Sequence, residues 1–121
     1  MLRFVFYVVW CAATVLMLIP GNEMPTAFQF WDKAQHALAF FVLTGLAIVS
    51  AWMQAQMARV AGAMLIYGGA IEIVQAFLPW RTGDFNDWIA DAVGVFCFVI
   101  VAHFFPALKI RIKPASRPTS I

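Results

Sequence analysis

The sequence predicts an all-α, polytopic membrane protein in which four transmembrane helices form an up-down-up-down bundle. Hydrophobic residues make up 64% of the 121 residues and charged residues only 12%, against roughly half and a quarter in soluble domains. Four apolar stretches approach the roughly 20 residues that a helix needs to cross the hydrocarbon core. The connections between them are short, so consecutive helices are expected to be antiparallel.

Proline residues mark the ends of three of these stretches. Pro20 follows the first, Pro79 the third and Pro106 the fourth, and proline stops helices because its ring removes a backbone donor. A cleavable signal peptide is the competing interpretation of the first stretch, since Arg3 precedes its apolar run. No small-x-small cleavage site follows, so we expect a retained helix. The predicted helices cover residues 2–19, 34–53, 58–78 and 87–105.

Charge is distributed unevenly between the two sides that alternating helices would create. One side collects six of the eight basic residues, namely Arg3, Arg59, Lys109, Arg111, Lys113 and Arg117, and the other keeps only Lys33 and Arg81. Basic loops stay in the cytoplasm, so both termini are expected there. The sequence then divides into a transmembrane domain, residues 1–108, and a short basic cytoplasmic tail, residues 109–121. All six acidic residues fall on the outer side: Glu23, Asp32, Glu72, Asp84, Asp87 and Asp91.

Polar residues recur at helical spacing on three of the predicted helices. Glu72 is the deepest, about 10 Å along the helix from Pro79, and ionisable groups at such depth are functional-site candidates because burying charge in lipid is costly. We expect the stripes to meet in an outward-facing polar pocket. Its predicted lining is Asp32, Lys33, His36, Glu72, Gln75, Arg81, Asp84, Asp87 and Asp91.

Structural roles compete with binding at several of these positions. Asp84 or Asp87 would suit the N-terminal cap of the fourth helix, where a carboxylate accepts free backbone N–H groups. Glu72 would otherwise form a structural hydrogen-bonded pair with Arg81 or His36. Asp32 and Lys33 would otherwise only mark a helix boundary, and His103 is expected to lie at the cytoplasmic interface.

The motifs together resemble those of the VanZ-like family of small bacterial membrane proteins. The resemblance covers about residues 32–98 and is carried by Asp32-Lys33-x-x-His36, Glu72-x-x-Gln75-x-x-x-Pro79-x-Arg81 and Asp84-x-x-Asp87-x-x-x-Asp91-x-x-Gly94. The chain departs from the family's pattern at Asp91, where the family often has Asn. The resemblance implies a multi-pass protein of the bacterial cytoplasmic (inner) membrane. The family takes its name from a member associated with resistance to teicoplanin, a glycopeptide that binds cell-wall precursors.

Binding of an envelope component is the function that the motifs favour. The expected partners are membrane lipids and a lipid-linked envelope precursor or glycopeptide-related ligand. Nucleic acid is not expected, because the basic residues form no stripe interleaved with exposed aromatic residues. The sequence assigns no cofactor, no resident metal and no catalytic residue, and it does not determine the oligomeric state.

Two further interpretations remain open. In the first, the protein is a membrane-embedded hydrolase or transferase acting on a lipid headgroup, with His36, Glu72, Asp87 and Asp91 binding a divalent metal or acting as acid and base. The sequence has no H-E-x-x-H motif, activated serine or phosphate-binding glycine loop to support that reading. In the second, the protein is purely structural. Proton conduction through a single four-helix copy is disfavoured, because the acidic residues cluster on one side and apolar residues dominate the inner half of the helices; association of several copies could alter that.

Overall fold

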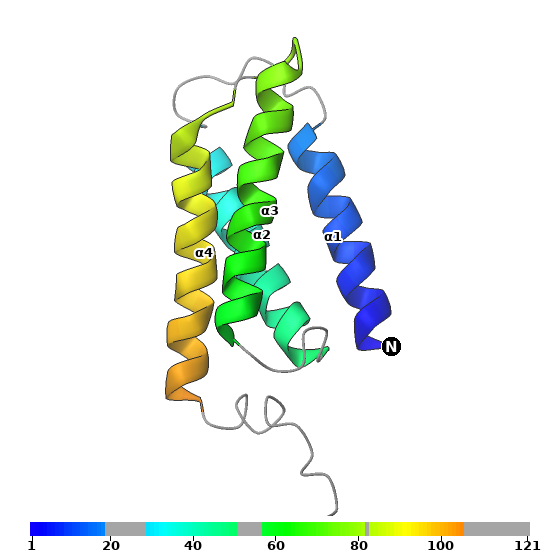
Figure 1. The fold of residues 1–121 in the computed structure, drawn as a ribbon, viewed down its shortest axis with the longest axis vertical. Coiled ribbons are helices and arrows are strands. Elements are labelled where there is room, and N and C mark those ends of the chain that lie inside the picture. Colours follow the sequence, from blue (N-terminus) through cyan, green and yellow to red (C-terminus); the bar gives the residue numbers. More distant parts are fainter. Residues whose placement is uncertain (19–28, 51–56, 82, 106–121) are drawn as a thin grey trace, which may run out of the picture.

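The computed structural model describes residues 1–18, 29–50, 57–81 and 83–105, and all regular structure in these ranges is α-helical. Figure 1 shows that α1 and α3 run away from the end that holds the amino terminus, while α2 and α4 run back toward it. The predicted all-α class and its up-down-up-down order are therefore confirmed for the described residues. The helices are α1 (Leu2–Leu18), α2 (Gln29–Val49), α3 (Met57–Phe77) and α4 (Phe85–Phe104).

The second helix forms the centre of the bundle. It contacts α1, α3 and α4 and packs most extensively against α4, whereas α1 and α4 lie at opposite edges in Figure 1. Phe40 and Leu43 of α2 and Val95 of α4 are fully buried between the helices. The core is therefore built around α2, and α1 is the more peripheral helix.

A glycine allows α2 and α4 to approach closely. A Cβ atom added at Gly94 would lie 2.0 Å from the carbonyl oxygen of Ala37, which is backbone that cannot rotate away. Close backbone approach at small residues is how helices pack where the solvent around them is itself apolar. Gly62 of α3 provides a contrast, since an added Cβ there meets no atom of the described residues within 4 Å.

The outer surface of the bundle is strongly apolar. Large side chains such as Phe4, Ile66, Phe77 and Phe104 are exposed, which is expected where the surrounding medium is lipid. Among the described residues, α3 and α4 are each long and apolar enough to cross a membrane. Two shorter apolar helices accompany them, α1 and the Lys33–Val49 part of α2.

Two helix starts differ from the predicted ones. The second helix begins at Gln29 rather than at residue 34, because the charge of Lys33 is balanced by carboxylates of a neighbouring segment. The fourth begins at Phe85 rather than at residue 87, because Asp84 caps it. The predicted end of the second helix at residue 53 and the basic tail, residues 109–121, lie outside the described residues.

Candidate functional site

Polar side chains gather at the end of the bundle opposite the amino terminus. There α1 and α3 end while α2 and α4 begin (Figure 1), so segments distant in sequence are brought to one level. His36 comes from α2, Glu72 and Gln75 from α3, and Asp91 from α4. Asp32 belongs to α2, but its side chain lies outside the described residues.

Lys33 joins the start of α2 to the start of α4. Its ammonium nitrogen lies 3.2 Å from Oδ2 of Asp84 and 2.9 Å from Oδ1 of Asp87. Asp84 is also the N-terminal cap of α4, and its Oδ1 accepts a 2.9 Å hydrogen bond from the backbone N–H of Asn86. That hydrogen bond, followed by the contact with Lys33, lowers the pKa of Asp84 below its ordinary value. The capping interpretation is therefore confirmed for Asp84, while Asp87 serves as an ion-pair partner.

Glu72 links α3 to the beginning of α4. Its Oε2 accepts a 3.0 Å hydrogen bond from the backbone N–H of Asp84. Sequence reasoning named side chains as its structural partners and did not consider this backbone group. Gly83 makes the approach possible, since a Cβ there would lie 2.7 Å from the carbonyl oxygen of Glu72. One oxygen of Glu72 thus has a structural role, which leaves the other to be explained.

His36 and Asp91 form a buried pair across α2 and α4. Nδ1 of His36 lies 2.9 Å from Oδ1 of Asp91, and the two residues are 2% and 0% exposed. The carboxylate of Asp91 occupies the space that a side chain at Gly68 would need, because a Cβ there would lie 2.8 Å from Oδ2. The absence of a side chain at Gly68 therefore helps to set the position of Asp91.

Three donors on or just after α3 satisfy the last carbonyl groups of α1. Nε2 of Gln75 donates to the carbonyl of Met17 at 2.7 Å. Nε1 of Trp80 donates to the carbonyl of Leu18 at 2.8 Å, and Nη2 of Arg81 donates to that of Leu16 at 3.3 Å. The last carbonyls of a helix have no partner within it, so these contacts cap α1. We call Gln75, Trp80 and Arg81 the α1 clamp.

Three buried oxygen atoms at this end have no hydrogen-bond partner among the described residues. They are Oε1 of Glu72, Oε1 of Gln75 and Oδ2 of Asp91. A buried acceptor without a donor costs roughly 1–3 kcal/mol, and native proteins contain few of them. Three such atoms at one end of the bundle indicate a site equipped to accept hydrogen bonds or to hold positive charge.

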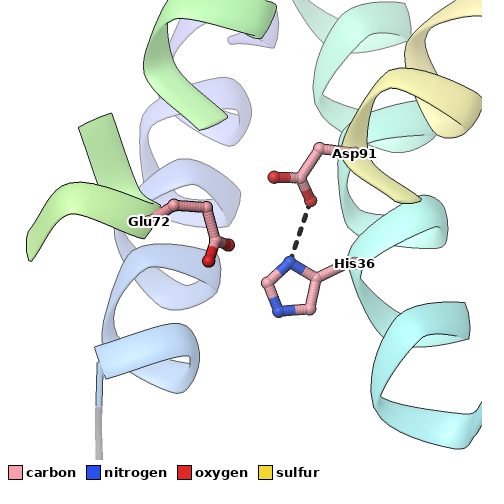
Figure 2. A group of neighbouring side chains, drawn as sticks. All are labelled: His36, Glu72 and Asp91. Atoms are coloured by element: carbon pink, nitrogen blue, oxygen red, sulfur yellow. Dashed lines mark hydrogen bonds and ion pairs between the residues drawn. The ribbon is translucent and has the colours of Figure 1, made fainter. Parts of the chain in front are cut away.

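Two of these oxygens belong to residues that converge with His36. His36, Glu72 and Asp91 each offer one potential metal-ligand atom, and these three atoms lie within 4.8 Å of one another. Figure 2 shows the three side chains directed toward one another from different helices. We call these residues the buried triad. A nitrogen and two carboxylate oxygens in this arrangement can bind a cation or transfer a proton.

The predicted site therefore divides into parts with different roles. Lys33, Asp84 and Asp87 form an ion-pair group, Gln75 and Arg81 cap α1, and only His36, Glu72 and Asp91 form the triad. His103 is exposed at the other end of α4, and its place at a cytoplasmic interface stays a prediction.

Sequence reasoning missed the role of Gly68 in seating Asp91. A signal was present, because Gly68, Glu72 and Gln75 follow i, i+4, i+7 spacing, which puts them on one face of a helix. No signal in the sequence indicated that Gln75 and Arg81 donate hydrogen bonds to carbonyl groups of α1.

A bundle with a strongly apolar surface, two described helices long and apolar enough to cross a membrane, and ionisable groups buried at one end indicates a helical membrane protein. The model of the VanZ/LLP1 family matches residues 3–106, and the chain belongs to this family. The resemblance inferred from the three motifs is thereby confirmed. No curated protein and no solved structure matches the chain.

Proposed function

We propose that this VanZ-type protein crosses the bacterial cytoplasmic membrane four times and binds a lipid-linked or peptide-bearing envelope component at an outward-facing polar pocket. The observation that carries the binding role is the group of buried acceptors on Glu72, Gln75 and Asp91 that have no donor among the described residues. A ligand that brings N–H groups or positive charge would remove that cost. Amines and amides of cell-wall peptides have this chemistry.

Cationic residues at the same end suit the acidic groups of such a ligand. Arg81 lies beside the end of α1, and its planar guanidinium matches the geometry of a phosphate or carboxylate. A lipid-linked cell-wall precursor carries both phosphates and a peptide. Since teicoplanin-type glycopeptides bind such precursors, altered glycopeptide susceptibility is the expected cellular effect.

The topology in this proposal has both termini in the cytoplasm. Its support is the six-to-two division of basic residues together with the antiparallel helix order (Figure 1). Reporter fusions test it. A reporter that is active only outside the cytoplasm should work after residue 82 and fail after residues 55 and 121. Activity after residue 55 would exclude the proposed orientation.

Complementation of a deletion strain tests the binding role. Glu72→Gln and Arg81→Ala should fail to restore the envelope properties and teicoplanin susceptibility of the wild type, at equal protein level in the membrane. Arg59→Ala is the matched control, because Arg59 is an exposed cation at the other end of α3 and should restore both. Full restoration by Glu72→Gln and Arg81→Ala would show that this end of the bundle is not the working part.

A membrane-embedded enzyme acting on a lipid headgroup is the second candidate. The His36–Asp91 pair favours it, because a histidine oriented by a buried carboxylate is a common general base. Headgroup hydrolysis or transfer by the purified protein should then disappear in His36→Ala and persist in His103→Ala. If the wild type binds the precursor without turning it over, the binding role stands alone.

A further inference from the structure

The buried triad combines ligand types that divalent transition-metal ions use. His36 supplies an imidazole nitrogen, and Glu72 and Asp91 each supply a carboxylate oxygen, with the three atoms within 4.8 Å of one another. Ligand atoms about 2.1 Å from a tetrahedral ion lie about 3.4 Å apart. Small side-chain movements are therefore enough to close the triad around an ion, and each ligand projects from a different helix (Figure 2).

Independent support comes from the acceptors that lack partners. Asp91 is fully buried, yet within the part of the chain that the structure describes its Oδ2 has no donor, and Oε1 of Glu72 is likewise buried without one. Their other oxygens are engaged, by His36 and by the backbone N–H of Asp84. Each carboxylate therefore has one buried oxygen that can coordinate an ion. Two neighbouring carboxylates also repel each other unless a cation or a proton lies between them.

We infer that the buried triad is a binding site for one divalent transition-metal ion such as Zn²⁺ or Mn²⁺. The imidazole disfavours Mg²⁺ and Ca²⁺, which prefer all-oxygen ligand sets. Three protein ligands leave at least one position on the ion for water or an anionic oxygen, as in catalytic zinc sites. The inference of a bound ion rests on the triad alone. A contact between this ion and a phosphate of an envelope ligand would rest on the proposed function as well.

Direct metal measurements test this inference without any envelope ligand. The full chain, purified in detergent with a tag that contains no histidine, is stripped with chelator and dialysed against Zn²⁺ or Mn²⁺. Elemental analysis should find about one ion per chain. The unfolding temperature should rise by about 5 °C or more once the free metal is 100-fold above the dissociation constant. Mg²⁺ at the same concentration should produce a smaller rise.

Conservative variants separate metal binding from folding. Glu72→Gln can still accept the hydrogen bond from Asp84, and Asp91→Asn can still pair with His36, but each loses an anionic ligand. Both should fold and lose most of the bound metal and of the thermal shift. The matched controls are His103→Ala, a histidine outside the triad, and Asp87→Asn, a carboxylate one turn away on α4. Both controls should retain the ion.

Three outcomes would overturn the inference. The first is a wild type that retains no metal and shows no thermal shift. The second is full metal binding by the folded Glu72→Gln and Asp91→Asn variants, which would place the ion elsewhere. The third is a shared proton between the carboxyl groups with no ion, seen as an infrared carboxylic-acid band that disappears in Asp91→Asn.

The proposed function is tested separately. A protein that binds the precursor but takes up no metal would contradict only the metal inference. A protein that binds the ion but no precursor would contradict only the proposed envelope ligand.

Discussion

The α1 clamp and the buried triad use the same face of α3 but solve opposite hydrogen-bonding problems. Gln75, in the clamp, directs its amide toward the end of α1, where helix carbonyls need donors. Glu72, nearly one turn earlier, directs its carboxylate toward the start of α4, where one oxygen meets a backbone N–H and the other meets no donor from any described residue. Oε1 of Gln75 and one oxygen each of Glu72 and Asp91 are buried without a partner among the described residues, so both regions contain such an acceptor. Only the triad brings two carboxylates together with an imidazole nitrogen, which marks it as the candidate cation site.

The largest expected effect comes from a substitution that forces apart α2 and α4, two of the helices that carry the triad. Gly94→Ala places a Cβ against the backbone of Ala37, so α2 and α4 must move apart, at a cost of about 3 kcal/mol in stability. The triad should fail first, because His36 and Asp91 lie on these two helices, while the clamp joins α1 to α3. Thermal unfolding in detergent measures the loss.

Gly62→Ala is the matched control for this change. No atom of residues 1–18, 29–50, 57–81 or 83–105 lies within 4 Å of the added Cβ, and alanine is the better helix former, so a gain of about 0.5–1 kcal/mol is expected. Equal effects of the two substitutions would contradict the close approach of α2 and α4.

Removing a donor from the clamp comes next in size. Gln75→Met keeps the length of the side chain but leaves the carbonyl of Met17 without its donor, which should cost about 1–2 kcal/mol. Metal binding should not change, because Gln75 is not a member of the triad. Gln35→Met, at an exposed position of α2, is the control. If the rise in unfolding temperature on adding metal is smaller in Gln75→Met than in the wild type, the α1 clamp and the buried triad act as one unit.

Adding a hydrogen-bond donor to the triad should raise the free energy of unfolding, whereas removing one from the clamp lowers it. In metal-free protein, Asp91→Asn replaces an oxygen that has no donor in the described ranges with an NH₂ group close to Glu72, and it removes one of two neighbouring negative charges. We expect a gain of about 1 kcal/mol in the free energy of unfolding after chelation. A marked loss of stability in denaturant unfolding would show that Oδ2 of Asp91 already has an essential partner.

The smallest effect concerns the ion-pair group beside the triad. The pKa of Asp84 is lowered in the fold by the N–H of Asn86 and then by Lys33. Its charge therefore contributes stability above the ordinary value of 3.8, and this contribution is lost as the pH falls through the lowered pKa. Asp84→Asn keeps a capping side chain and loses only the charge.

Thermal unfolding of the wild type and Asp84→Asn at neutral pH and at about pH 3 measures this contribution. The difference at neutral pH should be below about 1 kcal/mol, because the pair is partly exposed, and it should shrink in acid. A difference that widens in acid would reverse the assigned sign.

The fold could be predicted largely because apolar length and short connections constrain a membrane bundle strongly. The helix starts were less predictable. Lys33 looked like a boundary residue, yet it lies within α2 because Asp84 and Asp87 balance its charge from 51 and 54 residues away. Local sequence contains no record of such a partner. Asp84, in contrast, was open to prediction as a cap, since capping depends on residues only two or three positions away.

The sequence by itself determined the apolar character, the number and direction of the helices and the level at which the polar residues gather, because these follow from periodicity and chain length. Only the tertiary structure decided which polar groups are satisfied. Gln75 and Glu72 share one helical face, but one reaches carbonyls of α1 and the other reaches α4 and the His36–Asp91 pair. Hydrogen-bond partners depend on the rotation and spacing of neighbouring helices, which close contacts such as Gly94 on Ala37 and Gly68 beneath Asp91 establish.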